Sequence, residues 1–342
     1  MSRKAQLSLF TERYCKKNPG STLETSLPFT MVVDTWAAYD DDKVVTMGDG
    51  VKVETGSLYL SEEERLKECC AGVFQVMDRY GAGEDTETTY ILKPSATNKG
   101  AGITLIYCFE QLIDVLGSNS SIREWVLQTY VDRPLLLKGK KFHIRAYVLA
   151  VNAIQVFFYD EVLCLCSGTK YNKNATSLFG HITNTAYQAI DPGFKEEECV
   201  LVLEDVEGLL VKQGRSGADA KMVVQKILKD MQVVTGELFD AFKGEQSVYS
   251  PLPGCFEHSG LDFLVDEDFH VSLLEVNPGP DFKQTGERLQ GVVREMMEET
   301  VDICLGGVEF DKERNGNKFT KVFDHKVRGG GGSGEVRMKL LG

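Results

Sequence analysis

The stretch FEHSGLDFLVDEDFHVSLLEVN, residues 256–277, contains two apolar segments separated by an acidic turn at residues 266–268. The apolar segments have the length of ordinary strands, and the acidic turn between them favours an antiparallel hairpin. Because residues i and i+2 of a strand share a face, Glu275 and Asn277 project to the same side. Asp262 lies on the first strand, so pairing of the hairpin brings its carboxylate near that of Glu275.

These two carboxylates and the amide indicate a magnesium site. Hard oxygen ligands suit Mg²⁺, which proteins commonly hold with one or two carboxylates plus the phosphates of a substrate. The alternative is that Asp262 and Glu275 are surface residues at the edge of a sheet. The apolar residues around both favour the metal, because an unpaired charge is costly to bury. We therefore predict that Asp262, Glu275 and Asn277 are metal ligands.

A phosphate needs cationic groups, and the segment ILKPSATNKGAG, residues 91–102, contains them. Lys93 lies at the end of an apolar strand, where a lysine needs a partner or a route to solvent. The following loop contains Lys99, Gly100 and Gly102, and its glycines let backbone N–H groups approach phosphate oxygens. The loop does not have the P-loop pattern, and an ordinary turn is an equal alternative for it.

The segment KFHIRA, residues 141–146, places three basic side chains on one face of a strand. Alternation puts Lys141, His143 and Arg145 on that face and apolar residues on the other. Three such groups repel one another unless anions lie between them, and exposure at the surface is the alternative. The preceding residues 128–131, QTYV, offer backbone groups to an adenine ring, although periodicity alone does not establish this.

The composition is that of a soluble globular protein, with 42% hydrophobic and 26% charged residues and apolar runs shorter than the ~20 residues of a membrane span. Residues 1–17 lack the apolar segment of a signal peptide, so we expect a cytoplasmic protein whose nine cysteines are free thiols. The net charge of −13 argues against a general nucleic-acid binder. The dense basic patch at residues 138–145 is the candidate for binding an acidic partner.

The 342 residues suffice for two or three lobes. The clearest helix spans residues 219–243, with an apolar stripe from Met222 to Phe242 that we predict to be core. The strand pattern of residues 124–131 and of 141–166 predicts one antiparallel meander. The predicted division is an N-terminal lobe, a central lobe, a C-terminal lobe and a polar Gly-rich tail: residues 1–82, 83–145, 146–310 and 311–342.

Five motifs in one order resemble the tubulin-tyrosine ligase-like branch of the ATP-grasp superfamily, over roughly residues 85–305. They are YILKPSATNKGAGI, VLQTYVDRPLLL, KFHIRAYVL, HITNT and FEHSGLDFLVDEDFHVSLLEVN. The version KFHIR, together with PDFKQTG, is similar to the subgroup of fungal processing-body-associated ligase-like proteins. The resemblance implies an α+β class protein with the ATP-grasp fold, in which two α+β lobes sandwich ATP, preceded here by a small N-terminal lobe.

The resemblance also implies which residues contact ATP. They comprise a lysine in a strand, a glycine-containing loop that binds phosphates, the hinge that receives adenine, and residues that line the ribose and phosphates. These residues are Lys93, Lys99, Gly100, Gly102, Gln128, Thr129, Tyr130, Val131, Lys141, His143, Thr183 and Asn184.

The same resemblance implies that Asp262, Glu275 and Asn277 hold Mg²⁺. Arg145 and Lys141 would be catalytic, because they would stabilise the charge that develops during phosphoryl and acyl transfer.

The sequence departs from the family pattern at two places. His143 replaces the aspartate of the usual KFDIR motif. The arginine that relatives place before their YN turn, to hold the carboxylate of the incoming amino acid, has no counterpart in VLCLCSGTKYN, where Lys170 stands nearby. Lys170, together with Lys283 in the turn PDFKQTG, is a candidate for binding a substrate.

The resulting hypothesis is an ATP- and Mg²⁺-dependent carboxylate-amine ligase that adds an amino acid to a protein through an acyl phosphate. Tubulin is the usual acceptor of the family, and family analogy adds RNA-granule proteins as partners; no nucleic-acid or membrane partner is expected. One alternative is an ATP-binding pseudoenzyme or protein-interaction module. Another is a ligase for a non-tubulin acceptor or a small molecule.

Overall fold

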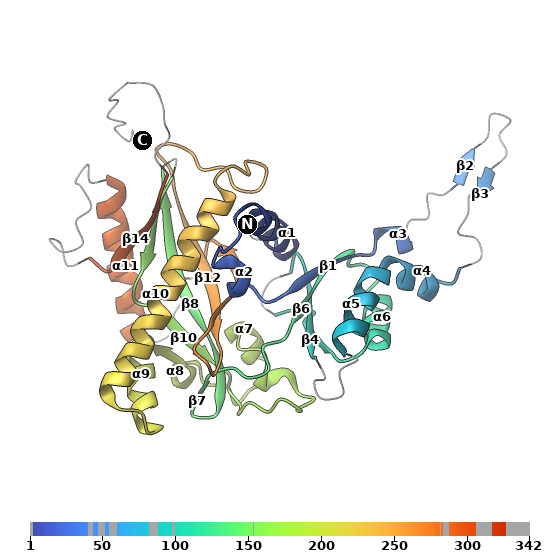
Figure 1. Cartoon of the computed structure of the whole chain (residues 1–342). Helices are drawn as coiled ribbons and strands as arrows, with labels where there is room; N and C mark the ends of the chain where they lie inside the picture. The colour runs from blue at the N-terminus through green and yellow to red at the C-terminus, as the bar shows by residue number, and fades with distance from the viewer. Residues whose placement is uncertain are drawn as a thin grey trace. The chain divides into compact units, whose positions relative to one another are not determined.

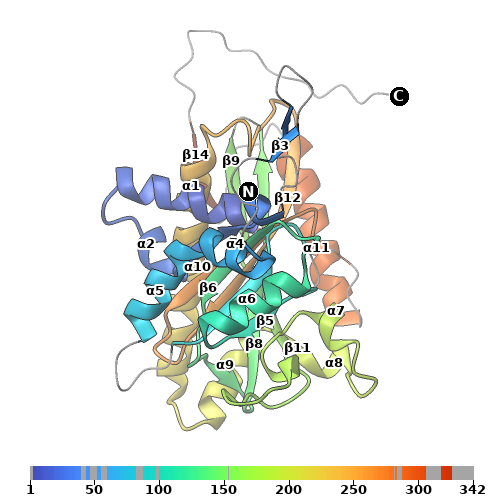
Figure 2. The ribbon, with the colours of Figure 1, turned by 90° about the vertical axis from the view of Figure 1, so that its right-hand side faces the viewer.

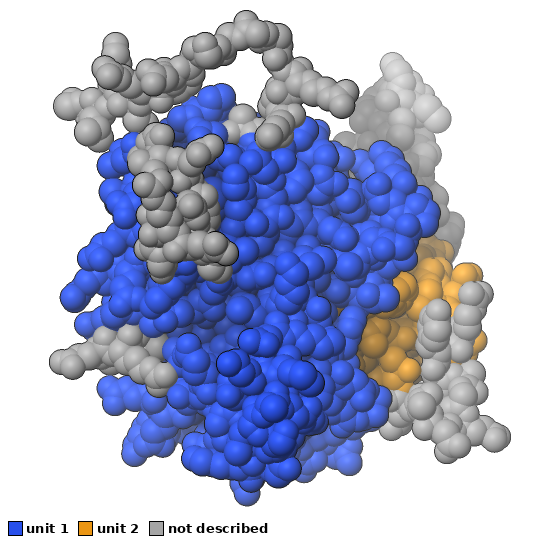
Figure 3. Space-filling model, turned by 60° about the vertical axis from the view of Figure 1, so that its left-hand side comes forward, with its two compact units in different colours: residues 1–27, 133–342 blue, residues 28–132 orange. Residues whose placement is uncertain are grey.

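The computed structural model describes most of the chain: residues 3–39, 44–46, 52–54, 60–81, 88–97, 100–152, 154–280, 282, 287–305 and 317–325. The chain forms two compact units, which Figure 3 colours separately. Unit 1 comprises residues 1–27 and 133–342, and unit 2 comprises residues 28–132. The four-part division expected from the sequence stays a prediction. Within the described part of the chain, no helix is long and apolar enough to cross a membrane.

Unit 2 contains a four-stranded antiparallel sheet in the order β1-β6-β4-β5 and a separate hairpin of β2 and β3. Apolar residues of four helices pack with those of the sheet, including Leu66, Met77 and Leu116 against Leu92 and Trp125. The elements are β1 (Thr30–Asp34), α3 (Trp36–Tyr39), β2 (Val44–Thr46), β3 (Lys52–Glu54), α4 (Glu62–Cys69), α5 (Ala71–Gly81), β4 (Tyr90–Pro94), β5 (Thr104–Ile106), α6 (Phe109–Ser118) and β6 (Glu124–Thr129).

Unit 1 contains an eight-stranded sheet whose main path is β11-β10-β8-β12-β13. Its strands are β7 (Leu136–Leu137), β8 (Lys140–Val151), β9 (Gln155–Tyr159), β10 (Leu163–Cys166), β11 (Val200–Val202), β12 (Phe256–Val265), β13 (Val271–Pro278) and β14 (Phe319–Asp324). Its helices are α1 (Lys4–Lys17), α2 (Leu23–Ser26), the 3-10 helix η1 (Leu178–Gly180), α7 (Thr185–Gln188), α8 (Glu196–Cys199), α9 (Leu203–Lys212), α10 (Gly217–Phe242) and α11 (Glu287–Leu305).

Strand β8 organises unit 1, because it pairs with β12 along one side and with β10 and β9 along the other. Its period of two separates two cores. Phe142 and Ile144 are buried with residues of α9 and α10, whereas Tyr147 and Leu149 are buried with Val292 and other residues of α11. Figures 1 and 2 show α10 and α11 on opposite faces of this sheet.

Three features differ from the sequence-based expectations. Strand β6 pairs with β4 and β1 in unit 2, so it does not form a meander with β8. Met222 of α10 is 63% exposed and lies outside the core, although Ile227, Met231 and Phe242 of the same stripe are buried. Strand β14, which pairs with β9, lies in the segment expected to be only a polar tail.

Helix α10 passes so close to β14 that it requires a glycine. A Cβ atom added at Gly236 would lie 2.6 Å from the backbone oxygen of Val322, whereas one at Gly208 of α9 would meet nothing within 4 Å. Gly236→Ala should lower the free energy of unfolding by about 1–3 kcal/mol, because backbone must shift to relieve the contact. Gly208→Ala should raise it by roughly 0.5–1 kcal/mol through helix propensity. Urea denaturation measures both, and equal effects of the two changes would contradict the close contact.

His258 of β12 makes the stability of unit 1 dependent on pH. Burial lowers the pKa of His258 from 6.5 to about 4, and its Nε2 lies 3.1 Å from Thr300 Oγ1 of α11. The unfolded chain binds this proton more readily, so stability falls as the pH drops from about 6.5 to 4, by up to about 3 kcal/mol. His258→Gln should flatten the curve of unfolding free energy against pH over this range. Parallel curves for the two proteins would contradict this assignment.

Candidate functional site

The acidic side chains of the hairpin lie together, as the sequence predicts. In the antiparallel pair of β12 and β13, Asp262 lies opposite Glu275, and Gly260 lies opposite Asn277. Asp262 is only 4% exposed. The hairpin therefore gathers two carboxylates and one amide at a single place on the sheet.

A β-bulge at Leu274 decides which face these side chains occupy. The register shifts so that Asp262 pairs with Glu275 while the next residue, Phe263, pairs with Leu273. Leu273 is buried in the α10 core. In a regular strand Leu273 and Glu275 would share a face, but the extra residue turns Glu275 to the side of Asp262. The sequence pattern does not reveal this bulge.

Arg145 of β8 neutralises Asp262. The two residues lie opposite each other across the β8–β12 ladder. Arg145 Nε and Nη2 donate to the two carboxylate oxygens of Asp262, the second at 2.9 Å. Burial disfavours the charged guanidinium, but Asp262 outweighs burial and raises the pKa of Arg145 above its usual range. The guanidinium thus stays charged and holds the carboxylate group in a two-point contact.

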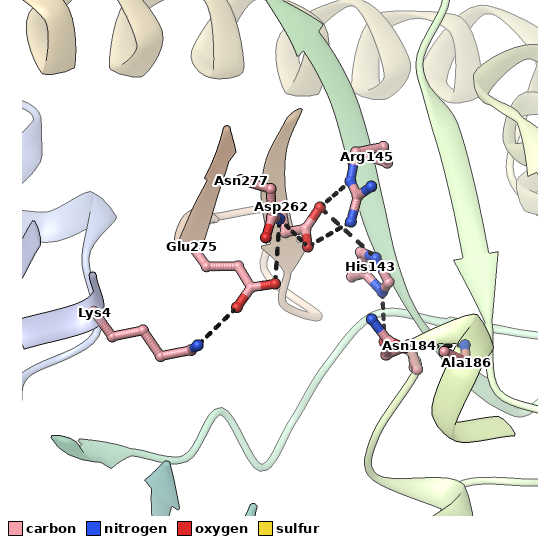
Figure 4. A network of polar contacts seen from close by, with 9 residues as sticks. Lys4, His143, Arg145, Asn184, Ala186, Asp262, Glu275 and Asn277 are labelled. Carbon is pink, nitrogen blue, oxygen red and sulfur yellow. Dashed lines mark hydrogen bonds and ion pairs between the residues drawn. The ribbon is translucent and has the colours of Figure 1, made fainter. Parts of the chain in front are cut away.

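Asn277 and Lys4 complete a chain of polar contacts that ends at the first turn of α1 (Figure 4). Asn277 Nδ2 lies 3.2 Å from Asp262 Oδ2 and 3.3 Å from Glu275 Oε1. Lys4 Nζ lies 3.5 Å from Glu275 Oε2. Lys4 was not predicted from the sequence, because no local pattern relates a lysine in the opening helix to a residue near position 275.

His143 is a buried, neutral member of the site. Its Nδ1 shares a hydrogen bond with Thr183 Oγ1 at 2.6 Å, and its Nε2 lies 3.9 Å from Asp262 Oδ1. Burial, together with the nearby charges of Arg145 and Lys141, lowers the pKa of His143 to about 3, although Glu275 opposes the shift. At neutral pH His143 therefore acts through hydrogen bonding and not as a cation.

Lys141 lies next to the loop that contains HITNT. Lys141 is 6% exposed, and its Nζ lies 5.9 Å from the centroid of the Tyr171 ring. Asn184 is the N-cap of α7 and accepts hydrogen bonds from Ala186 N and Tyr187 N at 3.0 and 3.3 Å. The hydrogen bond between Thr183 and His143 places Thr183 and Asn184 beside the basic face of β8.

Gln188, which was not predicted from the sequence, holds this loop in place. It is 1% exposed. Its Oε1 accepts from Gly168 N at 2.7 Å, and its Nε2 donates to Phe179 O at 2.8 Å and to Ile182 O. A buried glutamine that satisfies three backbone groups explains why a loop rich in polar residues keeps a fixed course.

In unit 2, Lys93 finds the partner that a lysine in an apolar strand requires. Lys93 Nζ donates to Gln128 Oε1 at 2.9 Å, and Gln128 Nε2 donates to Thr30 Oγ1 at 3.0 Å. The N–H groups of Thr129 and Tyr130 donate to Phe29 O and Thr89 O. These two donors are already satisfied, so a base bound at residues 128–131 would use other groups of the segment. Val131, at the end of the segment, is half-buried.

The remaining predicted residues are only partly placed. Gly100 and Gly102 both have a φ of 73°, the left-handed region that favours glycine. Lys170 is exposed, beside the turn at Gly139, whose carbonyl accepts from Tyr171 N at 2.9 Å. Lys99 and Lys283 lie outside the described residues.

The donor set fits Mg²⁺ in the way a nucleotide-bound ion is held. Across the described ranges, no group of three or more His, Cys, Asp or Glu side chains is arranged to hold a metal. The site instead offers two carboxylates and the Asn277 amide. A flip of this amide exchanges its nitrogen and oxygen and would turn the oxygen toward a metal ion. Mg²⁺ commonly takes one or two carboxylates and completes its six ligands with phosphate oxygens and water. Asp262, Glu275 and Asn277 fit that demand.

The chain matches the model of the tubulin-tyrosine ligase family over residues 63–314. It belongs to this family. A crystal structure of the C-terminal domain of K. lactis Pby1, described as an ATP-grasp enzyme interacting with the mRNA decapping enzyme Dcp2, has a TM-score of 0.63 to it. The two are 26% identical, and the match covers 96% of this chain and 81% of that one. The chain thus has the ATP-grasp fold, and the α+β fold predicted from the sequence is confirmed.

The chain matches only part of the length of these curated relatives. The probable tubulin–tyrosine ligase C12B10.04 of Schizosaccharomyces pombe is 33% identical over 63% of this chain and 58% of its own length. The probable tubulin–tyrosine ligase PBY1 of Saccharomyces cerevisiae is 28% identical over 72% of the chain and 38% of its own length. The protein polyglycylase TTLL10 of Mus musculus is 31% identical over 65% and 34%. The matches therefore span less than two thirds of each relative.

The buried pair of Arg145 and Asp262 should be the most costly ion pair to break. Asp262→Asn should lower the free energy of unfolding by about 3 kcal/mol, because it leaves a buried guanidinium without its counter-ion. Asp219→Asn is the matched control: its pair with Arg215 has an N–O distance of 2.9 Å, but the side chains are 44% and 37% exposed. The control should lose less than about 1 kcal/mol. Urea denaturation without nucleotide or metal tests both, and similar losses would contradict the buried pair.

Proposed function

We propose that the chain is an ATP- and Mg²⁺-dependent carboxylate-amine ligase that joins an amino acid to a protein. The observation that carries this proposal is the set of Asp262, Glu275 and Asn277 beside Arg145, in a chain with the ATP-grasp fold. Membership of the tubulin-tyrosine ligase family supports the reaction class.

The reaction has two steps. In the first, a carboxylate oxygen of one substrate attacks the γ-phosphorus of ATP, the bond to the β-phosphate oxygen breaks, and ADP leaves. In the second, the amine of the other substrate attacks the carbonyl carbon of this acyl phosphate. Inorganic phosphate leaves, the nitrogen loses a proton and an amide forms. Neither step needs a nucleophilic side chain, in keeping with the raised pKa values that burial gives the thiols of Cys164 and Cys166.

The proposed roles follow the charges of the residues. Mg²⁺, when bound, neutralises charge on the phosphates, and Asp262, Glu275 and Asn277 would hold it. Arg145 and Lys141 would stabilise the transferring phosphoryl group and the acyl phosphate as catalytic residues.

The proposed nucleotide contacts come from several segments. Lys93 and the loop of Lys99, Gly100 and Gly102 would bind the phosphates. The base would lie against Gln128 and the residues up to Val131. His143, with Thr183 and Asn184, would position the ribose and the phosphates, with the imidazole neutral.

The acceptor and the added amino acid are proposed only by class. Lys170 and Lys283 are the candidates for binding the substrate carboxylate, because the arginine usual before the YN turn is missing. A protein acceptor is favoured by the polyglycylase and tubulin ligase names of the relatives. Tubulin is the first acceptor to test, and the interaction of K. lactis Pby1 with the mRNA decapping enzyme Dcp2 motivates mRNA-decapping proteins as partners. We place this activity in the cytoplasm, where its nine free cysteines would stay reduced.

A specific observation favours one alternative, an ATP-binding pseudoenzyme that serves as a protein-interaction module. Both carboxylate oxygens of Asp262 are engaged by Arg145, and the adjacent His143 stands where an acidic residue is usual in the family. The human relative is named an inactive polyglycylase, at 27% identity. Turnover measurements separate this alternative from the ligase.

Glu275→Gln tests the proposal, because it removes the charge of one metal ligand and keeps its shape. ATP turnover by the purified protein, in the presence of amino acids and tubulin, should fall at least about a hundredfold, the loss typical for a group that stabilises transition-state charge. Glu257→Gln, at an exposed position on β12, is the control and should keep the wild-type rate. Equal phosphate release by the wild type and Glu275→Gln would contradict the ligase mechanism and favour the interaction module.

A further inference from the structure

Lys4 reaches the proposed metal site from the opening helix of the chain. It is the first residue of α1, and its Nζ lies 3.5 Å from Glu275 Oε2. The pair is largely shielded from water, since the side chains of Lys4 and Glu275 are 11% and 28% exposed. Figure 4 shows this ammonium on the side of Glu275 away from Arg145.

The helix that carries Lys4 is fixed to unit 1. Leu7 of α1 is buried in the core shared with α10. The rings of Phe10 and Phe242 lie 5.7 Å apart, and Tyr14 OH donates to Asp240 Oδ2 at 2.8 Å. The backbone at Lys4 is therefore anchored, so only rotation about the bonds of its four-carbon side chain would be needed for the ammonium to leave Glu275.

The position of β13 explains how a residue near the N-terminus reaches Glu275. β13 ends the main path of the sheet, next to β12. An edge strand is accessible from the side as well as from its two faces. The bulge at Leu274 turns Glu275 away from the apolar face of the sheet. In this position its carboxylate contacts the ammonium of Lys4.

The charges divide into two separate pairs. Arg145 occupies both carboxylate oxygens of Asp262, and Asn277 Nδ2 lies 3.3 Å from Glu275 Oε1. Among the described residues, Glu275 forms its ion pair with Lys4. A divalent ion bound to Glu275 would lie close to this ammonium, and two cations at such a separation in a partly buried place repel each other.

We propose that Lys4 is a positioning residue that acts as the resident counter-ion of Glu275 and is displaced when Mg²⁺ binds. Through this ion pair it orients the Glu275 side chain in the metal-free protein, and it sets the Mg²⁺ concentration at which the nucleotide is captured. This inference rests on the proposed function, because it takes Glu275 as a ligand of the nucleotide-bound ion. By linkage, the contact of Lys4 with Glu275 weakens the binding of Mg²⁺ by the same factor by which bound Mg²⁺ weakens the contact of Lys4.

A Mg²⁺ titration of nucleotide binding tests the proposal without relying on activity. The full chain is mixed with a fluorescent ATP analogue at a fixed concentration, and the Mg²⁺ midpoint is read from fluorescence anisotropy. Lys4→Met should lower this midpoint by about two- to tenfold, the range for losing a shielded ion pair that competes with the metal. Lys4→Arg keeps the charge and should stay near the wild-type midpoint.

Lys16→Met is the matched control, since it removes the same charge from the same helix. Lys16 pairs with Glu12 at the surface, where the side chains are 73% and 57% exposed. Its midpoint should equal that of the wild type. Thermal unfolding gives a second readout: Lys4→Met should melt below the wild type without Mg²⁺ and nucleotide, and match it when both are saturating.

The outcomes separate the two levels of inference. Nucleotide binding that depends on Mg²⁺ in the wild type, with an equal or higher midpoint in Lys4→Met, would overturn the role of Lys4 and leave the proposed ligase standing. A wild type that shows no Mg²⁺-dependent nucleotide binding would overturn both. A lowered midpoint in Lys4→Met, with unchanged midpoints in Lys4→Arg and Lys16→Met, supports the proposal.

Discussion

The site of unit 1 depends on one buried ion pair, between Arg145 of β8 and Asp262 of β12. Neither charge is tolerable alone at this depth, so the two strands must keep the register that places them opposite each other. Close packing beside this pair also favours a glycine on β12. A Cβ atom at Gly260 would lie 2.9 Å from Pro280 Cβ and 3.1 Å from Arg145 Cδ. The arginine therefore lies over a backbone without a side chain, and the carboxylates of the hairpin are arranged around it.

The sequence predicted the parts of this site that local alternation determines. The period of two on β8 separated Phe142 from His143 correctly, and the hairpin followed from its apolar segments and acidic turn. The bulge at Leu274 and the contacts of Gln188 escaped prediction, because they depend on partners brought together only by folding. The same holds for β6, which the pattern assigned to the wrong neighbours, and for Lys4, which lies at the other end of the chain from Glu275.

His143 shapes the electrostatics of the site without adding a charge. The imidazole is neutral because it is buried beside two cations, and it is fixed by its hydrogen bond to Thr183. Relative to an aspartate at this position, the basic face of β8 keeps one more unit of positive charge. For the ligase proposed above, this positive charge would favour the phosphates of ATP over a single carboxylate.

Strand β14 has a practical consequence for where this protein is cut. The family match ends at residue 314, before β14 begins at Phe319. Phe319 is fully buried in the α11 core, and Lys318 bridges Glu161 and Glu295. A chain shortened to the borders of the family would lose this strand, leaving β9 with an unpaired edge and an apolar gap beneath it. Such an edge is open to pairing with other molecules, so poor solubility of a shortened protein would reflect its boundary and not its fold.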